Sequence, residues 1–209
     1  MTTVVGKNRA WMGRHPQCGL VMFASSGEAS RDQAIKPTLV IDLYPIASQL
    51  SQSRRESGRT LVITSIHQQP NESWPRNIKV RSRLHYYLAD RLASRTVPDA
   101  LGVLVDFDGT ITDTSVANVL IAENGGLISP EPRQVLPGIT MQVIQELAEA
   151  SNLAWAHARI TPERLRAADE VLLTGTTAGI WFASSIDHRP PHPPGPIYKQ
   201  LRSACDNLI

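Results

Sequence analysis

Two aspartates stand at the end of an apolar run near the middle of the chain. The string from Val103 to Thr114 reads VLVDFDGTITDT, with Asp106 directly after the apolar residues and Asp108 two positions later. A carboxylate at the end of a buried strand can attack phosphorus, while a second carboxylate protonates the leaving group. Both carboxylates can also help to hold Mg²⁺. Asp106 and Asp108 are therefore candidates for metal-dependent phosphoryl transfer.

This string resembles the first motif of the haloacid-dehalogenase-type phosphatases, in which Asp106 would be the nucleophile and Asp108 the general acid and base. In that family the motif lies near the N-terminus, and a later acidic pair holds the metal. Here the motif begins at Val103, and no later acid stands in a Gly-Asp-x-x-x-Asp context. The phosphatase is therefore the least supported of the functions considered.

A second resemblance covers much more of the chain. Five segments resemble, in order and spacing, successive motifs of the class IV (fold type IV) aminotransferases, which depend on pyridoxal phosphate. That family includes branched-chain and D-amino-acid aminotransferases and aminodeoxychorismate lyase. The segments are IKVRSRLHYYLADRLA (Ile78 to Ala93), DGTITDTSVANVLI (Asp108 to Ile121), LPGIT (Leu136 to Thr140), ADEVLLTGTTAG (Ala168 to Gly179) and GPIYKQL (Gly195 to Leu201).

The resemblance makes Lys79 the catalytic residue. In the family motif, Ile-Lys opens a helix and the lysine binds pyridoxal 5'-phosphate covalently. A lysine amine suits this role because it forms an imine with an aldehyde, and because burial and nearby cations lower its pKa. Lys79 would then move a proton between the substrate α-carbon and the cofactor.

The resemblance also assigns the residues that bind the cofactor. The pyridine nitrogen of the cofactor stays protonated only beside a carboxylate. The resemblance implies that this carboxylate is Asp113, at a position where the family usually has glutamate. The phosphate would lie at the start of a helix, where backbone N–H groups bind anions without net charge. The implied residues of this phosphate site are Gly138, Ile139, Thr140 and, from the other side, Thr176; Leu136 would pack against the ring.

Three further residues are candidates for binding the substrate. Thr177 and Ala178 follow Thr176 and would hold the substrate carboxylate. Arg31, in GEASRDQ, resembles the arginine that captures this carboxylate in the D-amino-acid branch, although Gln33 stands where its companion histidine would be.

One motif of the family has no counterpart in the sequence. The family's small domain supplies a His-x-x-Arg-Leu segment whose arginine binds the cofactor phosphate, and MGRH (Met12 to His15) does not match it in order or context. The resemblance therefore implies a chain truncated at the N-terminus and an incomplete small α/β domain. Such an arginine would supply charge-assisted hydrogen bonds worth about 1.5–3 kcal/mol each.

The local patterns predict an α+β fold without strict alternation of strands and helices. The resemblance implies a large domain, residues 48–209, in which mixed strands form a pseudo-barrel with helices, after a remnant small domain, residues 1–47. The first seventeen residues are expected to be irregular, and Pro45 to Ser57 to be a linker. Strands are expected at Gly19–Ser25, Pro37–Leu43, Thr60–Ile66 and Val171–Thr176, and helices at Arg81–Arg95, from Pro137, from Thr161 and at Ile197–Leu208. In the first of these helices Leu84, Leu88 and Leu92 form one apolar face.

The composition is that of a globular protein. The apolar fraction is 42%, the charged fraction 19% and the net charge +2, so there is no footprint of nucleic-acid binding. No run approaches the roughly 18 apolar residues of a membrane span. Cys18 and Cys205 have neither metal-ligand nor disulfide spacing, which favours the cytoplasm and predicts no metal site.

The resemblance implies an amino-acid aminotransferase that acts as a homodimer on an amino acid and a 2-oxo acid. One alternative is aminodeoxychorismate lyase, in which the same Lys79 would drive pyruvate elimination. A catalytically impaired remnant that acts as a binding or interaction protein is the other alternative, and the missing arginine supports it.

Overall fold

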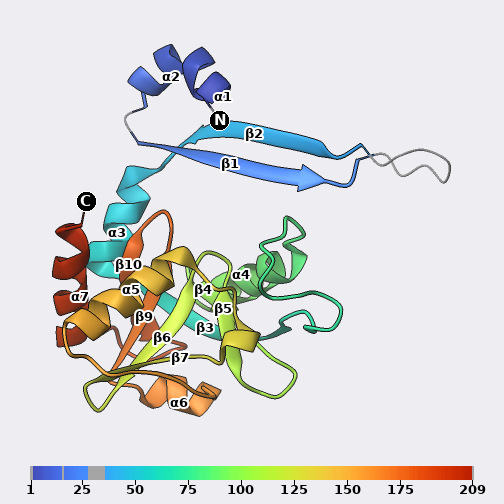
Figure 1. The fold of residues 1–209 in the computed structure, drawn as a ribbon. Helices are drawn as coiled ribbons and strands as arrows, with labels where there is room; N and C mark the ends of the chain where they lie inside the picture. Colours follow the sequence, from blue (N-terminus) through green and yellow to red (C-terminus); the bar gives the residue numbers. More distant parts are fainter. Residues whose placement is uncertain (1, 16, 28–35, 209) are drawn as a thin grey trace. The chain divides into compact units, whose positions relative to one another are not determined.

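The chain folds into two compact units, Met1–Leu50 and Ser51–Ile209. The computed structural model describes residues 2–15, 17–27 and 36–208 (Figure 1). In these ranges no helix has the length and apolar character needed to cross a membrane.

The first unit contains two short helices and a two-stranded antiparallel sheet. The helices are α1 (Thr2–Lys7) and α2 (Arg9–Gly13), and the strands are β1 (Cys18–Ser25) and β2 (Thr38–Pro45). Both strands confirm the sequence prediction, whereas the expectation of an irregular start is wrong. A helix of five or six residues shows less than two turns of a periodic pattern, so periodicity does not reveal it.

The second unit is built on a sheet of eight strands in the order β5-β4-β3-β10-β9-β6-β7-β8, and β5 also pairs with β6. Six strands therefore close into a ring, and β7 and β8 extend it. The pairs β3–β4, β3–β10 and β7–β8 are parallel and the others antiparallel, which confirms the predicted α+β pseudo-barrel. The strands are β3 (Arg59–His67), β4 (Leu101–Val105), β5 (Ile111–Thr114), β6 (Asn118–Glu123), β7 (Gly126–Ser129), β8 (Trp155–His157), β9 (Glu170–Gly175) and β10 (Gly179–Ile186).

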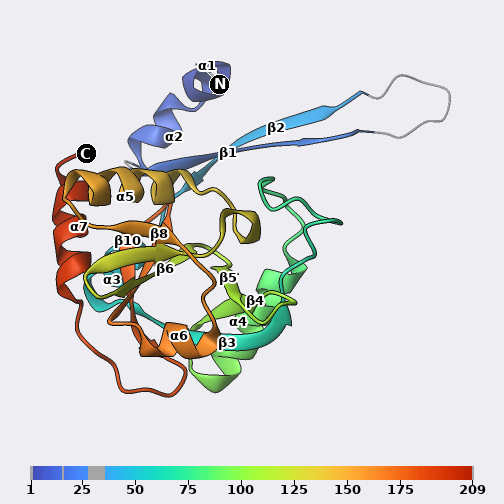
Figure 2. The same ribbon diagram turned by 60° about the horizontal axis from the view of Figure 1, so that its bottom comes forward.

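Side chains alternate between the inside of the ring and its outer face. On β9, Val171 and Leu173 join a buried cluster to which all six ring strands contribute, so this cluster fills the interior. Leu172, between them, belongs to a second cluster beneath helices α5 (Ile139–Ala150) and α7 (Pro196–Asp206). These two helices lie side by side on the outer face (Figures 1 and 2). The start of α5 is thereby fixed against the strands that carry the candidate site.

Helix α4 (Leu84–Thr96) packs on the sheet through small residues. Its buried side chains are His85, Ala89 and Ala93, and a Cβ atom on Gly102 of β4 would lie 2.5 Å from the carbonyl carbon of Ala89. The predicted leucine face is wrong as a buried face, because Leu84 and Leu88 are 66% and 43% exposed. The alanines share the four-residue spacing and allow a closer approach to the sheet.

Two other predictions about helices are corrected. The expected linker from Pro45 to Ser57 contains helix α3 (Ser48–Ser57), whose serine-rich sequence shows no apolar face. Helix α4 begins at Leu84, so Ile78 and Lys79 lie in the loop before it and do not open it. The position of Lys79 therefore depends on the contacts that fix this loop, and not on helix α4.

The predicted helix start at Thr161 is confirmed. Thr161 caps helix α6 (Pro162–Ala167) by accepting a hydrogen bond from the Arg164 N–H. The strands β6 and β7 are joined by Asn124 and Gly125, both with positive φ, as a two-residue hairpin requires. A short 3₁₀ helix, η1 (Pro132–Gln134), precedes α5.

Candidate functional site

A pocket in the second unit brings together residues that lie far apart in the sequence. Its empty space, counted together with the open solvent at its mouth, is about 820 Å³. Its walls come from the loop between β3 and α4, the β5–β6 hairpin, the segment entering α5, and the end of β9. Seven sequence-predicted residues line it: Lys79, Asp113, Leu136, Gly138, Ile139, Thr140 and Thr176.

Asp113 is a buried acid on β5. Its side chain is held by hydrogen bonds from the Asn118 side-chain amide (2.8 Å) and from the backbone N–H of Leu136 (3.1 Å). Burial raises the pKa of Asp113 to about 7, although these two hydrogen bonds and the charges of Arg76 and Lys79 act in the opposite direction. A buried carboxyl with this pKa is suited to a cationic partner from a ligand.

The start of helix α5 is suited to an anion, whereas Asp113 is suited to a cation. Its N-cap residue is Gly138, and no side chain caps the helix, so first-turn N–H groups remain for an anion. A Cβ atom on Gly138 would lie 2.1 Å from the Asn118 side-chain oxygen, so this position requires glycine. Near it, the buried Thr174 hydroxyl lines the pocket and has no hydrogen-bond partner among the described residues. This end of the pocket therefore offers unused donors to an anion.

Lys79 is exposed to the pocket. It makes no hydrogen bond and no ion pair with another described residue, although its charge acts on Asp113. Its amine is therefore available to a ligand.

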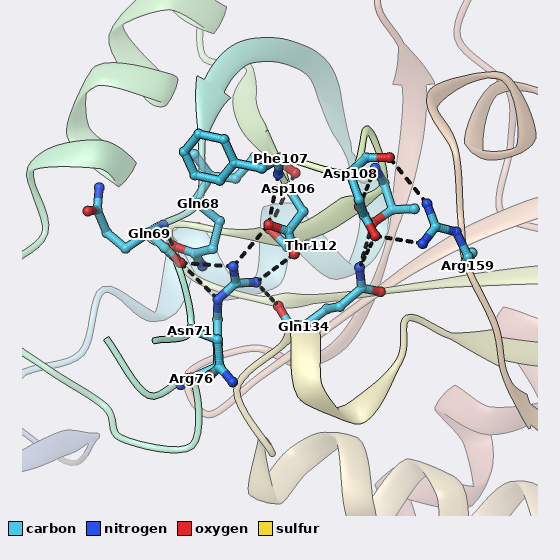
Figure 3. Close-up of polar contacts among 12 residues, drawn as sticks. Gln68, Gln69, Asn71, Arg76, Asp106, Phe107, Asp108, Thr112, Gln134 and Arg159 are labelled. Carbon is cyan, nitrogen blue, oxygen red and sulfur yellow. Dashed lines mark hydrogen bonds and ion pairs between the residues drawn. The ribbon is translucent and has the colours of Figure 1, made fainter. Parts of the chain in front are cut away.

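Arg76 makes hydrogen bonds to Gln69, Asp106 and Gln134 (Figure 3). Its buried guanidinium donates two hydrogen bonds to the Asp106 carboxylate, at 3.1 and 3.2 Å. It also donates to the backbone carbonyls of Gln69 (2.8 and 3.1 Å) and Gln134 (2.7 Å). Arg76 thus joins the Lys79 loop to the β4–β5 turn and to the segment before α5. No pattern in the sequence predicts this role, because a single arginine has no periodicity or motif.

The two aspartates of the phosphatase-like string have separate partners. Asp106 pairs with Arg76, whereas Asp108 accepts hydrogen bonds from Thr110 and pairs with Arg159 at 2.7 Å. No group of three or more potential metal ligands occurs in the described parts of the chain. The geometry therefore supports a structural role for Asp106 and Asp108.

Asp106→Asn is expected to lower the free energy of unfolding by about 3 kcal/mol, because it leaves the buried Arg76 charge without a counter-ion. Asp108→Asn is the matched control in the same turn. Its ion pair is half exposed, so the expected loss is below about 1 kcal/mol. Urea unfolding measures both values, and equal losses in the two variants would contradict this assignment.

Comparison with known proteins identifies the family of the chain. The family model described as amino-transferase class IV matches residues 2–186. The chain belongs to the class IV aminotransferases. The resemblance seen in the sequence motifs is thereby confirmed.

Several class IV aminotransferases are similar along most of the chain. The D-alanine aminotransferase of Bacillus licheniformis is 26% identical over 199 residues, which is 91% of this chain and 67% of that protein. The branched-chain-amino-acid aminotransferase of Pseudomonas aeruginosa is 26% identical over 195 residues, covering 91% and 62%. The chain thus spans about two thirds of the length of these relatives.

A solved structure shows that the fold is shared. The branched-chain amino acid aminotransferase of Escherichia coli has a TM-score of 0.86 and 22% identity, over 99% of this chain and 71% of that one.

Two of the predicted substrate-binding residues, Thr177 and Ala178, do not line the pocket. Thr177 is exposed and Ala178 is buried in the β9–β10 turn, where the Ala178 carbonyl accepts a hydrogen bond from Arg55. Arg31 lies outside the described residues. Their roles stay predictions. The pocket also contains residues that had no predicted role, notably Arg83, His85, Tyr86 and Gln68, of which the first three stand within the motif quoted for Lys79.

Proposed function

We propose that the protein catalyses the transfer of an amino group from an amino acid to a 2-oxo acid, with pyridoxal 5'-phosphate as cofactor. The observation that carries the proposal is the pocket itself, which combines a free lysine amine, a buried acid and an uncapped helix start. The names of the relatives, D-alanine and branched-chain aminotransferases, support the same activity. We also propose residues 48–209 as the cofactor-binding domain.

The residues present fit the proposed cofactor at both ends. The phosphate would be held at the α5 start, by Gly138, Ile139 and Thr140, with a hydroxyl from Thr176. The unpartnered hydroxyl of Thr174 is a further donor in this pocket. A solved branched-chain amino acid aminotransferase with a TM-score of 0.80 and 23% identity contains pyridoxamine 5'-phosphate. This likeness supports the choice of cofactor without placing it.

Asp113 would face the pyridine nitrogen. A protonated nitrogen beside the carboxyl favours the ionised form of Asp113 and lowers its pKa from the value of about 7. The carboxylate in turn keeps the nitrogen protonated. When bound, the cofactor supplies an electron sink for the electrons released at the substrate α-carbon.

Lys79 would attach the cofactor and then act as a base. Its Nζ atom would take the proton from the substrate α-carbon and deliver it to the cofactor side of the bond, which is general acid–base chemistry by one amine. Arg76 would hold the Lys79 loop in place during both steps through its bonds to Asp106 and Gln134.

A homodimer in the cytoplasm is part of the proposal. Family membership supports the dimer, and the free thiols of Cys18 and Cys205 agree with a reducing compartment. Elimination of pyruvate by an aminodeoxychorismate lyase is the alternative activity. A lyase-type structure from Legionella pneumophila, described as a 4-amino-4-deoxychorismate lyase, shares the fold with a TM-score of 0.80.

The test is a spectroscopic titration of the purified protein with pyridoxal 5'-phosphate. We expect a visible absorption band that free cofactor lacks, and its conversion to the amine form when alanine, leucine or glutamate is added, with release of the 2-oxo acid. Release of pyruvate from aminodeoxychorismate would favour the lyase. No band at saturating cofactor would contradict both activities and favour the impaired remnant.

A further inference from the structure

Arg83 is a cation in the pocket to which the proposed function gives no role. It stands at the N-cap position of α4, four residues after Lys79, and lines the same pocket. Arg76 is neutralised by Asp106. Arg83, in contrast, has no ion pair with a carboxylate in the part of the chain that the structure describes. A half-buried cation without a counter-ion is suited to an anionic ligand.

The neighbours of Arg83 fix its orientation without using all its donors. Its guanidinium carbon lies 4.8 Å from the centre of the Tyr86 ring, and one terminal nitrogen donates to the Ser115 carbonyl. Tyr86 is itself held, because its hydroxyl accepts a hydrogen bond from Gln68 at 3.1 Å. A guanidinium has five N–H donors, so most of them remain for a ligand. Arg83 is therefore pre-oriented at little further entropic cost.

The charges of the pocket residues also favour an anionic ligand. Lys79 and Arg83 are both positive, and neither α4 nor α5 has an acidic residue in its first turn. The pKa of His85 is lowered by burial, then by Arg83 and Arg76. The acid on the pocket wall is Asp113, with a pKa of about 7. With Arg76 paired to Asp106, the pocket keeps a net positive charge, which favours anionic ligands.

Arg83 belongs to a different wall from the proposed phosphate site. The phosphate site is at the start of α5, whereas Arg83, His85 and Tyr86 come from the start of α4. The two features therefore come from different elements of the pocket wall. A guanidinium binds a carboxylate through two parallel hydrogen bonds, which sets its orientation as well as its affinity.

We propose that Arg83 binds the α-carboxylate of the amino-acid substrate and so selects amino acids over simple amines. The inference rests on the proposed function, because it places the substrate beside Lys79. It gives the pocket a carboxylate-binding residue from within the motif that carries Lys79 itself.

The test compares ligands with and without a carboxylate in the cofactor-loaded protein. Calorimetry measures the dissociation constants of 4-methylvalerate, which has no amine to transfer, and of its neutral amide. Arg83→Gln is expected to raise the dissociation constant of 4-methylvalerate by about 10- to 100-fold, the range for losing a charged hydrogen-bond partner. The amide is expected to bind wild type and variant equally. Arg83→Lys keeps the charge but loses the paired geometry, so an intermediate constant is expected.

Arg91→Gln is the matched control. Arg91 lies on the same helix with its guanidinium 5.8 Å from the Tyr87 ring, but it is exposed and does not line the pocket. We expect unchanged 4-methylvalerate binding in this variant. The amino-group transfer step is followed in parallel with alanine, ethylamine and glutamate. A loss for alanine and glutamate alike, but not for ethylamine, identifies the α-carboxylate, whereas a loss confined to glutamate would assign Arg83 to a side-chain carboxylate and overturn the proposal.

Failure of the inference and failure of the proposed function give different results. If Arg83→Gln attaches cofactor normally and binds 4-methylvalerate as tightly as wild type, the inference is wrong and the proposed function stands. If wild type attaches no cofactor, the proposed function fails first. Far-ultraviolet circular dichroism tests whether Arg83→Gln is folded. If it is not, 4-methylvalerate binding is compared between wild type and Arg83→Lys instead.

Discussion

Lys79→Ala is expected to abolish covalent attachment of pyridoxal 5'-phosphate and to lower the transamination rate by about 10⁴-fold, the upper range for loss of a general acid–base group. No second lysine lines the pocket among the described residues, so no other amine can replace it. Because Lys79 is exposed and makes no hydrogen bond there, the free energy of unfolding should change by less than about 0.5 kcal/mol. The loss would therefore be chemical and not structural.

Borohydride reduction of the loaded protein, followed by peptide mass spectrometry, locates the attachment. The added mass is expected on the peptide that contains Lys79 in wild type and on no peptide of Lys79→Ala. Lys199→Ala, which removes an exposed lysine from α7, should retain both the adduct and the activity. A visible band of normal intensity in Lys79→Ala would refute the assignment.

The sequence was most informative where a local signal has a direct physical cause. Thr161 with Pro162 predicted the start of α6 because the hydroxyl satisfies a free N–H and proline needs none. The apolar run from Val171 predicted a strand, and in the structure β9 contributes to both the interior cluster and the cluster beneath the helices. The family motifs also predicted residues that the fold brings together. The Asn118 amide donates to Asp113, and Gly138 lies against the Asn118 side-chain oxygen.

The features that were missed depend on contacts between distant segments. Helix α3 has hardly any apolar residues, so what holds it is not in its own sequence: Arg55 donates to the Ala178 carbonyl, and the Tyr198 hydroxyl donates to the Arg55 carbonyl. The choice between the leucine and alanine faces of α4 depends on Gly102 of another strand. Arg76 likewise has a role only because the fold brings Asp106 and Gln134 to it. Spacing within one segment cannot predict such contacts.

Asp106 shows how a short motif can mislead in the same way. The string around it contains the residues of a phosphatase site, and their spacing is compatible with that chemistry. In the fold, however, the turn directs Asp106 to Arg76 and Asp108 to Arg159, on separate sides (Figure 3). Asp106 thus supports the loop that carries Lys79, and Asp108 holds Arg159.

Asp113→Asn is expected to remove a pH dependence of stability. The folded-state pKa of Asp113 is about 7, above the value of about 3.9 for an unfolded aspartate. The folded state therefore binds more protons between these values, and its stability falls as the pH rises from about 4 to about 7. Asp113→Asn carries no charge to bury, so this part of the slope should vanish.

Urea unfolding of the cofactor-free protein at pH 5 and pH 8 measures this slope. Wild type should lose more stability between the two pH values than Asp113→Asn, and Asp42→Asn, at an exposed position of β2, should keep the wild-type slope. Loading with cofactor should reduce the slope in wild type, because a protonated pyridine nitrogen beside the carboxylate stabilises its ionised form. Identical slopes in wild type and Asp113→Asn would show that Asp113 is not the buried acid responsible.

The same substitution is also expected to slow transamination by about 10²-fold or more, the usual cost of removing one electrostatic partner of the reacting group. Covalent attachment at Lys79 should survive, since it does not need the charge of Asp113. Asp113→Glu restores the charge and the residue usual in the family, but its extra methylene must fit between Asn118 and Leu136 at a cost of about 1–3 kcal/mol in stability. If charge is what matters, Asp113→Glu will be the less stable but the more active of the two variants. The reverse order of activity would mean that Asp113 acts through its hydrogen bonds to Asn118 and Leu136 alone.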